Sequence, residues 1–156
     1  MGHHIAVSET PDPADRAAIA AGLDAFNDAV VGPDSIRPLA VPVRDDAGRV
    51  VGGLWGWSYY GWLYVELLFV PESLRGRGVG TRVLEAAERA AAARGCRGVW
   101  LDTFTFQAPG FYERRGYAAL GTIPDHPPGH GRLILTKRLP RPRARPDRAP
   151  GRVRPR

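Results

Sequence analysis

The sequence predicts a mixed α/β domain in which a mostly antiparallel sheet carries helices on both faces. Three observations predict this fold class. Apolar runs of strand length are separated by turn residues, longer segments have helical periodicity, and the strand signals come first as a meander and then alternate with helices. A meander followed by crossover helices gives a mixed sheet with helices packed against it. The expected order of elements is β-α-β-β-β-α-β-α-β-β.

The first part of the chain predicts a short strand and then a helix. Residues Ile5 to Ser8 are the strand candidate. Pro13 suits the first position of a helix, and Asp12 before it suits the N-cap. Apolar residues then recur at helical spacing until Gly32 and Pro33 end the pattern.

A meander follows this helix, and helices alternate with strands after the meander. The turn from Asp45 to Gly48 predicts a hairpin, and Gly61 breaks the next one. Gly95 and Gly116 end the two later helices, as glycine commonly does at a C-cap. The expected elements are strands over Leu39 to Arg44, Val50 to Tyr59 and Trp62 to Val70, a helix over Thr81 to Arg94, a strand over Gly98 to Thr103, a helix over Ala108 to Arg115, and strands over Tyr117 to Ile123 and Arg132 to Leu139.

The charge of the chain divides it into a domain, residues 1–139, and a tail, residues 140–156. The formal net charge is +6 over 156 residues. The tail holds seven arginines and one aspartate, so the whole excess lies there and the domain is neutral. Because the tail is rich in proline and has almost no apolar residue, we expect it to be disordered. Nucleic acid is therefore not an expected partner of the domain, and weak, salt-sensitive binding through the tail is the alternative.

Cysteine usage and hydropathy indicate a cytoplasmic protein. The single cysteine, Cys96, excludes an internal disulfide framework, and its place between a helix and a strand favours a small packed residue over a nucleophile. No apolar run is long enough to span a bilayer, and the N-terminus lacks the order of a signal peptide. We expect no membrane association.

A glycine-rich hexapeptide between an apolar run and a helix predicts an anion site. It reads Arg75-Gly76-Arg77-Gly78-Val79-Gly80 and precedes Thr81. Glycines let backbone N–H groups converge there, and the helix adds the positive end of its dipole. The hexapeptide lacks the lysine of a Walker loop, and its third glycine is misplaced for a dinucleotide fingerprint. A pyrophosphate is the best match.

Two motifs give this chain a resemblance to the GCN5-related N-acetyltransferases, the GNAT superfamily. Arg75, Gly78 and Gly80 fit the R-x-x-G-x-G pattern of that family's acetyl-CoA loop, and Tyr112 to Tyr117 fits its Y-x-x-x-G-F/Y signature. The expected element order also resembles the GNAT fold from the first strand to Leu139. The resemblance implies acetyl-CoA as cosubstrate, with no metal, and leaves a homodimer open.

The resemblance assigns cofactor contacts to three segments. The strand before the loop would bond the pantetheine arm and the thioester oxygen through its backbone, since an unpaired edge accepts an amide-bearing chain. Thr105 stands where the family often has asparagine, so Thr105 or Gln107 would take over that hydrogen bond. The expected cofactor-binding residues are Leu68, Phe69, Val70, Arg75, Gly76, Arg77, Gly78, Val79, Gly80, Thr81, Thr105 and Gln107.

Two residues are candidates for proton transfer. Tyr112 matches the family position whose hydroxyl protonates the leaving thiolate, and a phenol with a pKa of ~10 suits that task. Strand alternation places Glu66, Leu68 and Val70 on one face, with Val65, Leu67 and Phe69 on the other. Burying an acidic side chain within such an apolar run is costly unless the side chain is paired with another group or has a functional role. Glu66 would take a proton from the acceptor ammonium, and a structural ion pair is the alternative.

The acceptor site has weaker signals. An aromatic group around Gly61 and a proline-rich loop before the last strand both lie where this family binds its acceptor. The aromatic rings could pack across strands or offer a cation–π face to an amine. Histidines in the loop could bind substrate or move protons. The expected substrate residues are Trp57, Tyr59, Trp62, His126 and His130.

The sequence therefore predicts an N-acetyltransferase that moves an acetyl group from acetyl-CoA to a primary amine of a small molecule, by direct attack in a ternary complex. A metabolite or an amine-bearing antibiotic is the expected acceptor. A protein N-terminal or lysine acetyltransferase is one alternative. A CoA-binding sensor module without catalysis is the alternative from another class.

Overall fold

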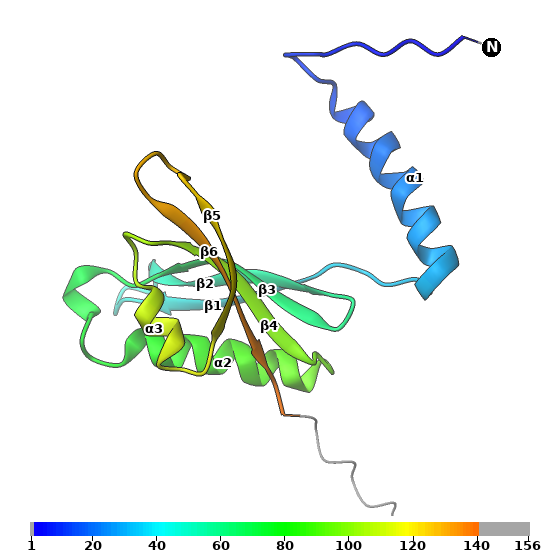
Figure 1. The fold of residues 1–156 in the computed structure, drawn as a ribbon. Helices are drawn as coiled ribbons and strands as arrows, with labels where there is room; N and C mark the ends of the chain where they lie inside the picture. Colours follow the sequence, from blue (N-terminus) through cyan, green and yellow to red (C-terminus); the bar gives the residue numbers. More distant parts are fainter. Residues whose placement is uncertain (1, 141–156) are drawn as a thin grey trace, which may run out of the picture. The chain divides into compact units, whose positions relative to one another are not determined.

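The computed structural model of this chain describes residues 2–140, in two units that divide between Ser35 and Ile36. The first unit holds one helix, α1 (Pro13–Val31), drawn in blue in Figure 1. The carboxylate of Asp12 accepts a hydrogen bond from the Ala14 N–H at 2.8 Å, which confirms the expected N-cap. None of the side chains of α1 is buried.

The strand expected over Ile5 to Ser8 is wrong. Residues 2–12 form neither helix nor strand, and the side chains of Ile5 and Val7 are 97% and 92% exposed. A run of four residues, two of them the small Ala6 and Ser8, has too little apolar surface to offset the entropy of ordering it. The remaining strands and helices of the expected order are present.

The second unit is a six-stranded sheet in the order β1-β2-β3-β4-β6-β5. Its strands are β1 (Arg37–Arg44), β2 (Val50–Tyr59), β3 (Trp62–Phe69), β4 (Gly98–Phe104), β5 (Ala118–Pro124) and β6 (Gly131–Arg138). Only β3 and β4 pair in parallel, while each other pair of neighbours is antiparallel. The predicted mixed, mostly antiparallel sheet is confirmed.

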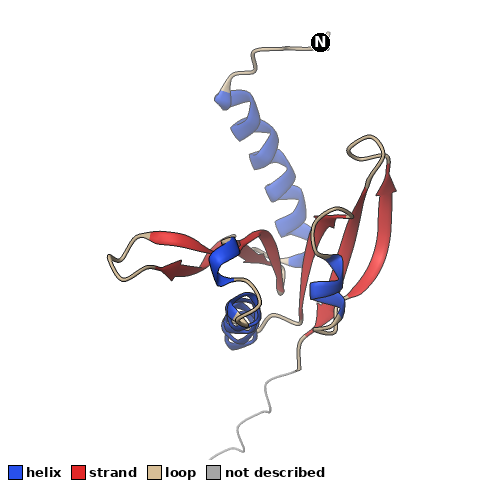
Figure 2. Cartoon of the chain, turned by 90° about the vertical axis from the view of Figure 1, so that its left-hand side faces the viewer, coloured by secondary structure: helices blue, strands red, loops and turns tan. Residues whose placement is uncertain are grey.

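Two helices of this unit lie on the same face of the sheet, as Figures 1 and 2 show. They are α2 (Val79–Ala93), which packs across β1 to β4, and the short α3 (Pro109–Glu113). A 3₁₀ turn, η1 (Glu72–Leu74), precedes α2. We call the face that carries α2 and α3 the inner face and the opposite one the outer face.

The core lies between α2 and the inner face. Leu63, Leu101 and Leu135 come from neighbouring strands, and their side chains are 0–1% exposed. From α2, Leu84, Ala87 and Ala91 are fully buried against them, because their spacing of three and four residues puts them on one side of the helix. This packing fixes the start of α2 relative to the sheet.

The sheet opens between β3 and β4, and this opening positions the site. The two strands are in register from Trp62 opposite Gly98 to Val65 opposite Leu101. Beyond that pair, β3 runs on to Phe69 and β4 to Phe104 without pairing to each other. Figure 2 shows the two halves of the sheet spreading apart. We call the place where pairing ends the mouth.

Residues 141–156 lie outside the described residues, and with them nearly all of the tail that the sequence predicts to be disordered. Within residues 2–140, no helix has the length and apolar character needed to cross a membrane.

Candidate active site

Glu66 lies in a β-bulge at the mouth. On β2, Gly56 is opposite Val65 and Trp55 is opposite Leu67, so Glu66 has no partner residue on that strand. It is also the first residue of β3 beyond the pairing with β4. Bulges commonly redirect a side chain next to an active site.

The bulge changes which side chains of β3 share a face. Val65 is buried and Leu68 packs against the core, whereas Leu67 and Phe69 are 60% and 56% exposed. The expected alternation through Glu66 is therefore wrong, because the extra residue shifts the strand by one position. The side chain of Glu66 is exposed, so it does not need an ion pair to offset a cost of burial.

Backbone groups of the segment after Glu66 line the open edge of β3. Leu68 and Phe69 pair with β2 on one side and have no strand on the other. The carbonyl oxygen of Val70 accepts a hydrogen bond from Arg75 Nε at 3.0 Å, so the end of this segment is tied to the glycine loop. An edge of this kind can bond an extended, amide-bearing chain.

The glycine loop leads directly into α2. Gly78 is the N-cap with φ of +72°, a left-handed conformation that glycine adopts without the strain other residues incur. The first helical donor is the Arg82 N–H, which bonds the Gly78 carbonyl at 3.0 Å, so the N–H groups of Val79, Gly80 and Thr81 precede the ladder. Space within 4 Å of a Cβ built at Gly76 or Gly78 is empty. The loop thus presents donors and room for an anion.

Gly80 allows close packing between the start of α2 and α3. A Cβ at this position would lie 3.3 Å from the Phe111 ring, which is tighter than an ordinary contact, and 3.5 Å from Val70, so a side chain here would displace the ring by a few tenths of an ångström. The start of α2 therefore packs directly against α3.

Arg115 ties the same two helices together. Its Nη1 donates to the Phe111 carbonyl at 2.7 Å, its Nη2 donates to Thr81 Oγ1, and its guanidinium carbon lies 3.9 Å from the centroid of the Phe111 ring. Arg115 Nε is buried and has no hydrogen-bond partner among residues 2–140. We call this contact set, Thr81, Phe111 and Arg115, the clamp.

Tyr112 follows Phe111 on α3, and its side chain is 9% exposed. Its ring lies edge-on to Phe111 and to Tyr117, with centroids 5.0 and 5.7 Å away. Burial raises the pKa of Tyr112 to about 12. The phenol is therefore protonated throughout the physiological range, as a proton donor must be, although it is a weaker acid than the free side chain.

Thr105 and Gln107 are both held by hydrogen bonds in which the side-chain oxygen is the acceptor. The Thr105 hydroxyl accepts from the Gly131 N–H at 3.0 Å, which fastens the end of β4 to β6. Gln107 Oε1 accepts from Thr103 Oγ1 at 2.8 Å and from the Phe104 N–H at 2.9 Å. Its amide nitrogen makes no hydrogen bond within residues 2–140. Because the Thr105 hydroxyl only accepts in this contact, its O–H can still donate, so each of the two residues retains a donor for a ligand.

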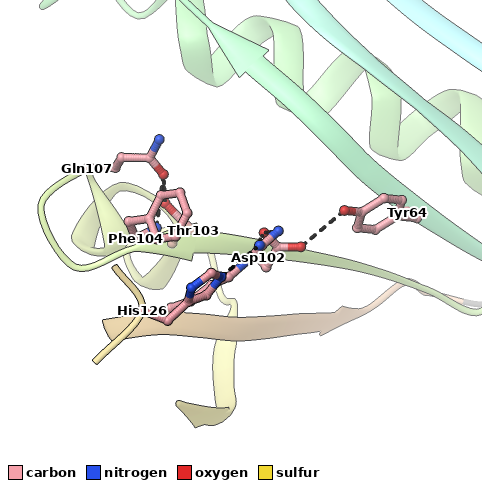
Figure 3. A network of polar contacts seen from close by, with 7 residues as sticks. Tyr64, Asp102, Thr103, Phe104, Gln107 and His126 are labelled. Carbon is pink, nitrogen blue, oxygen red and sulfur yellow. Dashed lines mark hydrogen bonds and ion pairs between the residues drawn. The ribbon is translucent and has the colours of Figure 1, made fainter. Parts of the chain in front are cut away.

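A polar network crosses the outer face at the mouth, and Figure 3 shows it from close by. Tyr64 Oη donates to Asp102 Oδ2 at 3.1 Å. Arg132 Nε and Nη2 lie 2.7 and 2.5 Å from Asp102 Oδ1. Arg132 Nη1 lies 3.3 Å from His126 Nε2, so the loop before β6 joins the network. We call Tyr64, Asp102 and Arg132 the outer triad.

The predicted substrate residues separate into two groups. Trp57 lies edge-on to Tyr64, with ring centroids 4.8 Å apart, and His126 contacts Arg132, so both adjoin the outer triad. His130 packs edge-on to Phe106 in the same loop region.

Tyr59 and Trp62 pair at the closed end of the β2–β3 hairpin. Trp62 covers Gly98 and carries Arg138 over its ring at 4.9 Å. Four strand residues, about 13 Å, separate Trp62 from Glu66. Its contacts are those of a packing residue.

A cavity of about 510 Å³ adjoins the clamp on the flank of α2 and α3, lined by Thr81, Leu84, Glu85, Glu88, Arg114, Arg115 and Lys137. Lys137 Nζ and Tyr117 Oη bond Glu88 at 2.7 and 2.9 Å, so its carboxylate is neutralised. Within the described range, no three histidine, cysteine or acidic side chains gather as metal ligands would.

The sequence of this chain matches a known family. A sequence model described as the acetyltransferase (GNAT) family matches residues 4–117. This chain belongs to the GNAT family. Acetyltransferase Atu2258 of Agrobacterium fabrum is 39% identical over 133 residues, which cover 85% of this chain and 97% of that protein.

Two further comparisons agree with this. Blasticidin-S acetyltransferase of Streptomyces morookaense is 45% identical over 107 residues, covering 66% of this chain and 79% of that protein. The crystal structure of an acetyltransferase from Bacillus cereus superposes with a TM-score of 0.79 at 33% identity, covering 88% of this chain and 98% of that one. The protein is an acetyltransferase by family and by fold.

Sequence reasoning missed three residues at the mouth of this GNAT acetyltransferase. Tyr64 belongs to the aromatic group around Gly61, for which packing and an acceptor pocket were both open, but it is not among the expected substrate residues, and neither Asp102 nor Arg132 has an expected role. Alternation along residues 98–104 puts Trp100 and Asp102 on one face, a signal that was available. The pairing of Asp102 with Arg132, thirty residues away on an antiparallel strand, had no local signal.

Proposed function

We propose that this protein transfers an acetyl group from acetyl-CoA to a primary amine of a small molecule, with both substrates bound at once. The observation that carries the proposal is the open edge of β3, which lies between the glycine loop on one side and the exposed carboxylate of Glu66 on the other. Bound there, acetyl-CoA supplies a thioester whose C–S bond breaks as the amine nitrogen forms the new C–N bond.

The residues present fit that cosubstrate. The first-turn N–H groups of α2, the empty space over Gly76 and Gly78, and the exposed Arg75 and Arg77 suit a pyrophosphate. The edge from Leu68 to Val70 suits an amide-bearing arm, and the free amide nitrogen of Gln107 adds a donor.

Three groups then perform the chemistry. Glu66, directly or through water, takes the proton that the acceptor ammonium must lose before it attacks. Backbone N–H groups of the β3 edge stabilise the negative charge that develops on the thioester oxygen. Tyr112 donates its proton to the departing sulfur, and its raised pKa keeps that proton in place until the sulfur becomes basic.

A small-molecule acceptor is favoured over a protein acceptor. The relative from Streptomyces morookaense, at 45% identity, is named for blasticidin S.

A turnover screen tests the proposal. Purified protein and acetyl-CoA are incubated with blasticidin S, aminoglycosides, simple amines and short peptides, and thiol release and product mass are followed. We expect acetylation of at least one small amine. Preferential acetylation of the peptides would support the protein acetyltransferase alternative. CoA binding without any acetylated product would instead indicate a sensor module.

A further inference from the structure

The outer triad fixes the direction of one hydrogen bond. Arg132 is a permanent cation, and two of its nitrogens contact Oδ1 of Asp102. In this ion pair the carboxylate oxygens of Asp102 can only accept. Tyr64 Oη, 3.1 Å from Oδ2, must be the donor in that contact. A tyrosine hydroxyl has one proton, so Asp102 leaves Tyr64 with lone pairs alone for any other partner.

This oriented oxygen lies at the mouth. Tyr64 immediately precedes the last paired residue of β3, and Asp102 immediately follows the last paired residue of β4. Their side chains meet across the point where the strands begin to separate, as Figure 3 shows. Glu66 is two residues beyond Tyr64 on the same strand.

The electrostatic surroundings agree with this placement. Burial raises the pKa of Tyr64, the hydrogen bond and charge of Asp102 raise it further, the charge of Arg132 lowers it, and the charge of Glu66 raises it by a smaller amount. Tyr64 is therefore neutral at physiological pH.

Two tryptophan rings flank the ring of Tyr64. The ring centroid of Tyr64 lies 4.2 Å from Trp100 and 4.8 Å from Trp57. Trp100 is 37% exposed, although it is a large apolar side chain in a central strand. The faces of such rings attract cations. Carboxylate, ring faces and a lone-pair oxygen together suit a group that is positively charged and carries N–H donors.

We propose that Tyr64 orients the acceptor: its hydroxyl oxygen receives an N–H of a protonated primary amine, while Asp102 and Arg132 hold the hydroxyl proton away from that amine. This rests on the proposed function and names the chemistry of its second substrate. Trp57 and Trp100 hold the cation through their ring faces. Tyr64 is thus a positioning residue for the step in which Glu66 removes the proton.

Matched pairs of ligands distinguish the contribution of the N–H donors to binding from that of the positive charge. Benzylamine, phenethylamine and tryptamine are each compared with their N,N,N-trimethyl counterparts, which keep the charge and lack every N–H. Binding to the protein with CoA present is measured by isothermal titration calorimetry. We expect wild type to bind the primary amines about ten- to hundredfold more tightly, as loss of a hydrogen bond to a charged group predicts. Tyr64→Phe should bring that ratio close to one.

The remaining variants test the direction of the hydrogen bond. Asp102→Asn keeps one oxygen, which Arg132 would retain, and turns an NH2 donor toward Tyr64, so the hydroxyl proton is no longer held there. The preference for primary amines should therefore fall while the trimethyl ligands bind as before. Asp45→Asn is the matched control, because Asp45 also pairs with an arginine, at 2.8 Å, but lies in the β1–β2 turn. It should leave the preference unchanged. The KM for acetyl-CoA should stay within twofold in all three variants.

Three outcomes would overturn the inference. One is a Tyr64→Phe variant that keeps the wild-type preference for primary amines. Another is an equal loss of affinity for both ligand types together with a higher KM for acetyl-CoA, which a structural role would produce. The third is a wild type that acetylates amines in the screen yet binds the two ligand types equally. A wild type that acetylates nothing overturns the proposed function instead, and this inference with it.

Discussion

The proposed donor side and the proposed acceptor side of the site are built in different ways. On the inner face, the glycine loop, α2 and α3 are joined by the clamp, whose residues Thr81 and Arg115 are 34 residues apart along the chain, and by the close contact of Gly80 with Phe111. On the outer face, the outer triad joins three strands, with separations of 38 and 30 residues along the chain. The donor side uses backbone groups, glycine and buried rings, whereas the acceptor side uses half-exposed polar side chains.

This difference shows which substrate each side can discriminate. Backbone donors at a helix start recognise a phosphate group in any protein that carries them. Side chains on a half-exposed face can be exchanged without altering the core, so they select the partner of that particular enzyme. Variants on the two sides should therefore have separable effects.

The largest expected effect is that of Tyr112→Phe, on the donor side. Loss of the acid should lower kcat about 10²- to 10⁴-fold, with little change in the KM of either substrate. Because burial raises the pKa of Tyr112 to about 12, the phenol keeps its proton at pH 10. The ratio of wild-type to variant kcat should thus be flat from pH 7 to 10. A ratio that declines with a midpoint near pH 10 would contradict the buried environment.

Glu66→Gln should have the next largest effect and concerns the acceptor. We expect kcat to fall about 10²-fold at pH 7, since the amine must then lose its proton to water. Raising the pH should restore part of the rate, because more of the amine is already neutral. CoA affinity measured by calorimetry should not change. A variant with the wild-type pH profile would show that another group is the base.

Breaking the clamp should give an intermediate effect confined to the donor. Arg115→Met removes the hydrogen bonds to Thr81 and Phe111, and we expect the KM for acetyl-CoA to rise about fivefold to tenfold. Thr81→Val should do the same to a smaller extent. The double variant should resemble Arg115→Met alone, because both substitutions remove the same contact between Arg115 and Thr81. Additive effects would show that the two side chains act independently.

The smallest effect should come from the loop backbone. Gly78→Ala places a side chain at φ of +72° and should lower the free energy of unfolding by about 1 kcal/mol. Gly22→Ala is the control within α1, where the added Cβ meets nothing within 4 Å, and it should raise stability slightly. Urea unfolding measures both. Equal effects of the two substitutions would mean that the loop glycine is not held in the left-handed conformation.

Local elements were predicted more fully than contacts between strands, for a physical reason. The cap at Asp12 depends on residues within one turn of its helix. The helix expected from Thr81 begins at Val79, because Gly78 is its N-cap. The bulge at Glu66 escaped prediction because strict alternation assumes an unbroken strand, and one extra residue reverses it. The contact of Asp102 with Arg132 depends on the register of β4 with β6, which no short motif encodes.

The bulge at Glu66 has a consequence for how enzymes of this build can change. A residue outside both ladders contributes nothing to strand register, so its replacement does not propagate along the sheet. Position 66 is therefore a point where one mutation can supply a different base, or a different charge, to a new acceptor at little cost in folding stability. The site can acquire a new substrate there while its grip on the acetyl donor stays the same.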